Sequence, residues 1–323
     1  MVGGKTRHCR RWLRWCIFGV AELAGLACRI ALAQDLAPRA YAIAPSRSNA
    51  LTITYSFFNG NLDFQGAVPV KDATAKVIVP ILTYYRSFEV FTRSANFMAS
   101  LPYGRGTFRG TVLQTETNAY RSGFFDSVYR ISFNVAGGPA MDLAEFRRWH
   151  QKQIVGISLR IVAPTGQYDA AKLINYGTNR WAFKPEVGYS RRYGHWVLDA
   201  YGGAWFYSRN RKFFSNNEYN PGIQSQTQAP VGALEAHLSY DVRTRFWASL
   251  DANFWSGGKT SLNGVENPDT TQRSSRLGIT TSLPIGKHQS VKCSYSAGAY
   301  IRYGGNYQNL SVAWQYSWIS RRY

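Results

Sequence analysis

Residues 229–258 read APVGALEAHLSYDVRTRFWASLDANFWSGG, and apolar side chains recur there at every second position. One series of alternate positions is apolar: Leu234, Ala236, Leu238 and Tyr240. The interleaved series is polar: Glu235, His237, Ser239 and Asp241. The alternation resumes from Phe246 to Trp255 after a short polar link. Because successive side chains of a strand point to opposite faces, this stretch predicts an antiparallel hairpin with one apolar and one polar face.

The polar face of this hairpin carries carboxylates, which a dry core would not accept unpaired. Long strands with one apolar and one wet face are typical of a transmembrane β-barrel. The composition agrees, because the chain has 21 Tyr and 10 Trp but only 17% charged residues. Tyr and Trp gather at membrane interfaces. No run of about twenty uninterrupted apolar residues follows the N-terminal region, so a helical membrane protein is not expected.

The N-terminus has the pattern of a secretory signal. A basic region from Lys5 to Arg14 precedes a mostly apolar stretch, which ends in Ala31-Leu32-Ala33 before Gln34. We expect a signal peptide over residues 1–33, cleaved at Ala33/Gln34, and delivery to the bacterial outer membrane. Its removal takes six basic residues and one acidic residue, so the net charge falls from +20 to +15. A linker over 34–50, a barrel over 51–318 and a tail over 319–323 would follow.

Thirteen segments have strand character: 51–58, 76–87, 93–101, 107–118, 126–136, 151–163, 181–191, 195–207, 229–241, 245–255, 272–283, 289–303 and 309–318. Residues 141–150 have a helical pattern and predict a short connecting helix. From residue 164 onward the links alternate between long and short, as in barrels with long external loops and short periplasmic turns. Because bacterial barrels have even strand numbers, we expect twelve strands, with fourteen as the alternative. Segment 51–58 is the one in doubt, since it is short for a tilted span.

The polar strand faces would line the barrel lumen. The candidate residues of a solute pathway are Arg130, Arg160, Glu186, Asp199, Tyr201, Trp205, Glu235, His237, Trp247, Asp251, Arg276, Lys292 and Arg302. The acidic members fall between residues 181 and 255, and the basic members fall between 272 and 303 together with Arg130 and Arg160. Opposed arcs would put a field across a pore, whereas charge pairing between neighbouring strands would fill a narrow lumen. The inward Trp and Tyr side chains would form a track for apolar solutes or pack as filler.

The long link 164–180 supplies three further candidates, Asn175, Asn179 and Arg180, for a constriction that binds solute. The alternative is a loop held together by Asn side-chain turns. His237, Ser239 and Glu235 lie on one strand, where they do not build a nucleophile–base pair. There is no metal-ligand spacing, phosphate loop or glycine fingerprint, so we expect no catalytic residue, no metal and no cofactor.

Five motifs resemble one known family. They are APTGQYDAAKLINYGTNRWAFKPEVGYS (163–190), LPYG (101–104), RSGFFD (121–126), SSRLGIT (274–280) and AWQYSW (313–318). In these the chain resembles the outer-membrane transporter family named for the meta-pathway of phenol degradation, over about residues 38–318. The resemblance implies a secreted barrel that passes hydrophobic or aromatic compounds. The chain departs from the family pattern at Phe125, where a glycine is usual, and at Cys293.

We therefore expect an outer-membrane channel that passes small aromatic or hydrophobic molecules by passive diffusion. The alternative is a structural or adhesive barrel with a plugged lumen. The expected partners are the solute, outer-membrane lipids, lipopolysaccharide, whose phosphates suit a basic rim, and the barrel assembly machinery, which prefers an aromatic-ended last strand. Lys and Arg are too dispersed to predict nucleic-acid binding.

Overall fold

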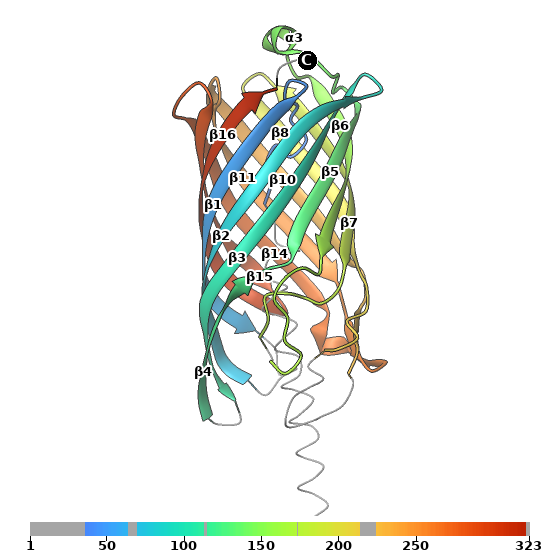
Figure 1. The fold of residues 1–323 in the computed structure, drawn as a ribbon, viewed down its shortest axis with the longest axis vertical. Coiled ribbons are helices and arrows are strands. Elements are labelled where there is room, and N and C mark those ends of the chain that lie inside the picture. Colours follow the sequence, from blue (N-terminus) through green and yellow to red (C-terminus); the bar gives the residue numbers. More distant parts are fainter. Residues whose placement is uncertain (1–35, 64–69, 113–114, 173, 214–223, 321–323) are drawn as a thin grey trace, which may run out of the picture.

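The structure is a computed structural model, which describes residues 36–63, 70–112, 115–172, 174–213 and 224–320. The expected signal peptide, residues 1–33, lies outside these ranges, as do the last three residues of the expected tail. The wall is one antiparallel sheet closed on itself (Figure 1). Its strands are β1 (Ser48–Asp63), β2 (Val70–Val90), β3 (Arg93–Val112), β4 (Thr115–Phe124), β5 (Ser127–Ala136), β6 (Gln153–Ala163), β7 (Ala182–Tyr193), β8 (Trp196–Tyr207), β10 (Val231–Arg243), β11 (Phe246–Gly257), β14 (Gln272–Pro284), β15 (Gln289–Ile301) and β16 (Gly304–Ile319).

The expected twelve-strand barrel is confirmed. β4 and β5 both pair with β3, β4 along its second half and β5 along its first, so together they form one interrupted wall strand. Sequential antiparallel pairing continues from β5 round to β16, and β16 pairs with β1 over the whole of both strands. β1 pairs with β2 and β2 with β3, which closes the barrel.

The surplus thirteenth segment has a different origin from the one expected. Segment 51–58 belongs to β1, a full span of 16 residues, so the doubt about it was wrong. The expected strands 93–101 and 107–118 are instead one strand, β3, which turns into β4. Pro102, Gly104 and Gly106 break the sequence pattern between them, but β3 stays extended there. A Cβ at Gly104 would lie 2.3 Å from the Phe125 ring, so the glycine permits a close contact rather than a turn.

The lipid-facing surface of the barrel is an apolar belt. Exposed large apolar side chains lie on the outer side of the wall strands, and several strands carry them at alternate positions; they include Ile53, Leu82, Ile131, Ile157, Leu234, Leu250, Leu277 and Leu310. Aromatic pairs flank the belt at both ends, among them Trp196–Tyr240 and Tyr103–Phe124. Such girdles mark membrane–water interfaces. The alternation in the sequence therefore separates a lipid-facing side from an enclosed one.

Among the described residues, no helix has the length and apolar character needed to cross a membrane.

The two ends of the barrel differ in their connections. At one end lie the short turns between β2 and β3, β7 and β8, β10 and β11, and β14 and β15, together with the segment that contains α3 (Leu143–Arg148). Asp142 and Glu145 cap this helix reciprocally, and it confirms the short helix predicted at 141–150. At the other end lie the long links. One of these carries β9 (Gln226–Gln228), and the next carries β12 (Thr260–Leu262), β13 (Val265–Asn267) and the 3₁₀ turn η1 (Pro268–Thr270). By the loop-length rule the α3 end is periplasmic.

Candidate solute pathway in the barrel lumen

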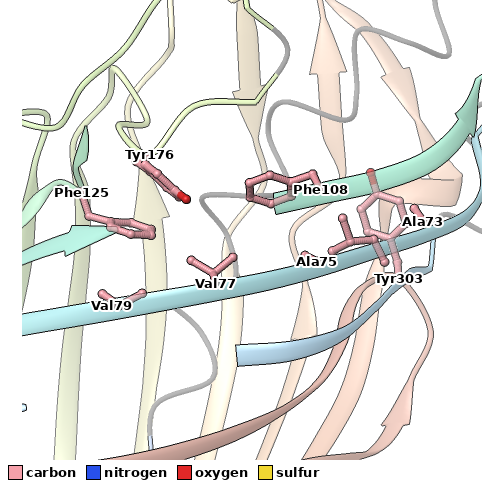
Figure 2. Close-up of a cluster of buried hydrophobic side chains, with 9 residues drawn as sticks. Ala73, Ala75, Val77, Val79, Phe108, Phe125, Tyr176 and Tyr303 are labelled. Atoms are coloured by element: carbon pink, nitrogen blue, oxygen red, sulfur yellow. The ribbon is translucent and has the colours of Figure 1, made fainter. Parts of the chain in front are cut away.

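The lumen has an apolar wall on β2. Ala73, Ala75, Val77 and Val79 point inward from alternate positions of this strand, and all four are buried. Phe108, Phe125, Tyr176 and Tyr303 gather over them from β3, the β4–β5 junction and two links (Figure 2). This cluster borders a cavity of about 350 Å³. A cavity of that size, lined mostly by apolar side chains, is at the lower end of the range for small-molecule sites.

The cavity also has charged lining residues, which come from β5, β6, β15 and the β4–β5 junction. They are Arg130, Arg160, Lys292 and Asp126. Asp126 accepts hydrogen bonds from the backbone N–H groups of Gly166 and Thr178, at 2.9 and 2.8 Å, and from the Thr178 hydroxyl. Its carboxylate therefore anchors link 164–180, while the three cations supply the remaining charge of the cavity wall.

Residues 36–47, most of the expected linker, run inside the barrel toward the periplasmic end (Figure 1). Tyr41 is the centre of their packing and is only 1% exposed. Its ring lies against Gly156 and Gly188, where a Cβ would come within 2.2 and 2.0 Å of it. The Tyr41 hydroxyl lies 3.0 Å from both Ser158 Oγ and Glu186 Oε1. These contacts fix the segment across the lumen.

The flanks of Tyr41 are held by lumen residues that the sequence had singled out. The Arg39 and Ala40 N–H groups donate to Asp199 Oδ2 at 3.3 Å and to the Tyr201 hydroxyl at 3.0 Å. The Arg39 guanidinium stacks over the Trp247 ring, 4.6 Å from its centroid. Asp199, Tyr201 and Trp247 thus bind the chain's own N-terminal segment.

The lumen charges around Lys184 and His237 are paired, both within one strand and between strands. Lys184 Nζ lies 2.6 Å from Glu186 Oε2 and 2.7 Å from Glu235 Oε1. His237 Nδ1 lies 2.8 Å from Asp251 Oδ1. These pairs favour the alternative of charge pairing in a narrow lumen over opposed acidic and basic arcs. Paired buried charges satisfy one another where water is excluded.

The inward tryptophans are packed. Trp205 and Trp255 are 0% and 1% exposed and form one cluster with Val162, Ala182, Val231 and Ala233. Arg276 is equally buried, donates to Ser296 Oγ and the Tyr307 carbonyl oxygen, and stacks on the Tyr307 ring. Their close packing favours the interpretation of filler over a solute track.

Arg302 departs from the expected inward position on a strand. It lies with Tyr303 in the two-residue bend between β15 and β16, because β15 ends at Ile301. Lys292, by contrast, lines the cavity.

The three loop candidates stabilise the links. The Asn175 amide donates to the carbonyl oxygens of Asp169 and Lys172 and accepts from the Asp169 N–H. Asn179 donates to Asn210 Oδ1, and Arg180 donates to Gln228 Oε1 and stacks over Tyr207. These bonds favour the structured-loop alternative.

Sequence reasoning missed Tyr41, Phe125, Asp126 and Tyr176. Tyr176 packs on Phe125 with ring centroids 4.5 Å apart, and burial raises the pKa of its phenol above the usual value, so it stays neutral. One signal for the cavity was present: residues 73–82 of β2 are apolar on both faces except for Thr74 and Lys76. A wall strand without inward charges points to an apolar lumen surface.

A closed barrel with a lipid-facing belt and an enclosed polar interior defines the class as outer-membrane β-barrel. Residues 54–318 match the family described as "Putative MetA-pathway of phenol degradation", and the chain belongs to this family. No curated protein sequence matches the chain.

Two solved structures share the fold. An outer-membrane channel from Pseudomonas putida F1 is 17% identical, with a TM-score of 0.72 over 88% of this chain and 100% of that one. The transport unit of the autotransporter AIDA-I from Escherichia coli is 12% identical, with a TM-score of 0.51 over 94% and 98% of the two chains. At these identities the likeness concerns the fold alone.

Proposed function

We propose that the protein is an outer-membrane channel that admits small aromatic or hydrophobic molecules. The observation that carries the proposal is the cavity of about 350 Å³ against the apolar face of β2. A purely structural barrel would gain stability by filling such a space with side chains. The family match and the channel from Pseudomonas putida F1 support the same class of function. No catalytic role is proposed.

The test is solute binding inside the cavity, measured by ¹⁹F NMR with 4-fluorotoluene and the purified, folded barrel. Val77 points into the cavity, whereas Leu82 on the same strand is 47% exposed on the lipid-facing side. Val77→Trp fills the cavity and Leu82→Trp is the matched control. We expect the fluorine signal to broaden in the presence of the wild-type protein and of Leu82→Trp. With Val77→Trp the signal should stay sharp, because the probe no longer binds. Equal spectra for all three proteins would refute binding in the cavity.

The plugged structural barrel is the second candidate. Its supporting observation is the packing of Tyr41 across the lumen, together with the ion pairs around Lys184. In that case the cavity is a packing defect, so no solute would bind and deletion of the gene would leave uptake unchanged.

The remaining assignments belong to the same proposal. Residues 1–33 act as a signal peptide cleaved at Ala33/Gln34, residues 34–50 precede the barrel, and 319–323 form a tail. The barrel assembly machinery inserts the chain, and lipids and lipopolysaccharide surround it. Mass spectrometry of the protein extracted from outer membranes tests the cleavage site, because the mature N-terminal residue should be Gln34.

A further inference from the structure

The outer side of β2 and β3 carries a group of cations at the end of the barrel with the long links. We propose that Lys76, Arg105 and Arg109 bind the phosphate groups of a lipid A-type glycolipid in the outer leaflet, while its acyl chains lie against the apolar belt. This site is on the lipid-facing wall rather than in the lumen. The inference therefore does not depend on the proposed channel function.

The three side chains point away from the lumen. Val77 of β2 and Phe108 of β3 are buried and face inward. Because successive side chains of a strand point to opposite faces, Lys76 on β2 and Arg105 and Arg109 on β3 belong to the outward series. All three are exposed, so they are accessible to a lipid beside the barrel.

The strand register gathers the three cations around Thr107. Lys76 stands directly opposite Thr107 on the neighbouring strand. Arg105 and Arg109 are the next outward residues of β3 on either side of it. Neighbouring strands lie about 4.8 Å apart, and alternate residues of one strand lie about 6.7 Å apart. A phosphate group at this place can therefore contact Lys76 and one of the arginines at once.

The cations nearest the belt are not neutralised by the wall. Among the described residues, none of the three forms an ion pair or a side-chain hydrogen bond. Glu116 on β4 lies one outward position beyond the level of Arg109, and Asp72, in a bulge of β2, also lies beyond that level. Lys76 and Arg105 therefore have no carboxylate as a strand neighbour.

The site begins where the apolar belt ends. On β2 the outward position before Lys76 is Ile78, and on β3 the outward position before Arg105 is Tyr103. Tyr103 packs edge-on against Phe124 in the aromatic girdle of this end. Because such girdles mark the membrane–water interface, the cations lie at the level of the lipid headgroups. A bound headgroup would leave its acyl chains beside the belt.

The two arginines suit phosphate in particular. A guanidinium presents paired N–H donors that match two oxygens of one phosphate, whereas a lysine acts as a point charge. Arg105 and Arg109 are four positions apart on one extended strand, or about 13 Å. Lipid A carries a phosphate at each end of its disaccharide. The spacing therefore fits one headgroup with two phosphates.

The neighbouring strands offer partners for sugar hydroxyl groups. Asn59 of β1 stands opposite Lys76, and Gln308 of β16 stands opposite Asn59. Asn61 and Asn306 occupy the next outward position of the same two strands, and all four amides are exposed. An amide both donates and accepts hydrogen bonds. Amides beside cations match a phosphorylated sugar better than the headgroup of a phospholipid.

The test is lipid binding to the purified, delipidated barrel, measured by native mass spectrometry in detergent. The probes are diphosphoryl lipid A, monophosphoryl lipid A with the same acyl chains, and phosphatidylglycerol. We expect the diphosphoryl form to bind at least about tenfold more tightly than the monophosphoryl form, the factor that a charge-assisted hydrogen bond supplies. Phosphatidylglycerol should bind most weakly. Equal affinity of the two lipid A forms, or tightest binding of phosphatidylglycerol, would overturn the proposal.

Substitutions locate the site. Arg105→Gln should weaken binding of diphosphoryl lipid A about tenfold. Lys76→Gln, Arg105→Gln and Arg109→Gln combined should abolish the preference for the diphosphoryl form. Arg273→Gln is the matched control, because Arg273 is an exposed cation on the outer side of β14 at the same end of the barrel. An equal loss of affinity in Arg105→Gln and Arg273→Gln would show that only the total charge matters, and would refute the assigned site.

Inorganic phosphate distinguishes a lipid site from a simple anion site. Added in large excess, it should leave lipid A bound, because phosphate alone makes no contact with the apolar belt. Displacement of lipid A by inorganic phosphate would show that the cations bind any phosphate and would overturn the assignment to a glycolipid. A heat-dependent gel-mobility shift identifies the folded barrels before each measurement.

Discussion

Replacement of Tyr41 by alanine should release the N-terminal segment from the lumen. The Tyr41 ring fills the space above Gly156 and Gly188, and it packs edge-on against Tyr201 with centroids 5.2 Å apart. Its hydroxyl lies within hydrogen-bonding distance of Ser158. Tyr41 is 1% exposed, against 8% for Ile43 on the same segment.

The size of the effect follows from these contacts. Truncation of a buried aromatic side chain to alanine costs about 3–5 kcal/mol, because the ring's burial is lost and a cavity remains. Neighbouring side chains relax into part of the space, so we expect the free energy that holds the N-terminal segment in the lumen to fall by about 3 kcal/mol. Since 1.4 kcal/mol is a factor of ten, the ratio of released to docked segment should rise about a hundredfold.

Single-channel recording in planar bilayers measures this shift. Wild type should be mostly closed to ions, and Tyr41→Ala should show frequent, longer openings. Tyr41→Phe, which keeps the ring, is the matched control and should stay close to wild type. The mutation Gly188→Ala places a methyl group against the Tyr41 ring and should open the channel in the wild-type background but add nothing in Tyr41→Ala. Unchanged conductance of a correctly folded Tyr41→Ala barrel, or additive effects of the two mutations, would refute the reasoning.

Three further substitutions test the lumen and its external link. Lys184→Met leaves two buried glutamates without their shared cation, so the free energy of unfolding should fall by about 3–5 kcal/mol. The heat-induced gel-mobility transition should then occur at a lower temperature than in wild type. An unchanged transition temperature would contradict the pairing of Lys184 with the two glutamates. Asp126→Ala leaves the backbone N–H groups of Gly166 and Thr178 without their acceptor, at about 1–3 kcal/mol for each donor left unpaired. Limited proteolysis should then cut link 164–180 faster than in wild type, and equal rates would show that the carboxylate is not its anchor. Phe125→Ala removes the ring that packs on Tyr176, which should enlarge the cavity and lower stability by about 3–5 kcal/mol. Binding of bulkier fluoroarenes by ¹⁹F NMR checks the enlargement, and an unchanged size limit would count against it.

Local chemistry made the barrel predictable from the sequence. The two-residue period is clear in most wall strands, because each of them meets lipid on one side and an enclosed space on the other. The capping pair Asp142 and Glu145 marks the start of α3 in the same local way. The rule that bacterial barrels have an even number of strands was enough to predict twelve strands. The prediction attributed the extra segment to residues 51–58, whereas it arose from dividing β3 in two. Gly104 and Gly106 look like a break in the sequence pattern, but β3 continues through them.

The candidate site was harder to foresee, because its parts are far apart in the chain. Tyr41 meets Gly188 and Glu186 across some 145 positions of sequence, and neither glycine nor tyrosine carries a local mark of that contact. The same holds for Asp126, whose acceptors are used by a link that begins 38 residues later. The inward-pointing charged residues could be listed from the sequence. Which of them pair with Lys184 depends on how the strands are aligned with one another.

The sequence by itself determined the class of fold, the faces of the strands and the residues that point inward. Only the tertiary structure decided what fills the lumen, because closure of the barrel sets which inward side chains meet and how much space they leave. On one side the charges of β7, β10 and β11 neutralise one another and enclose the N-terminal segment. On the other side the small side chains of β2 do not reach across, and the space they leave is the apolar cavity beside Arg130 and Arg160.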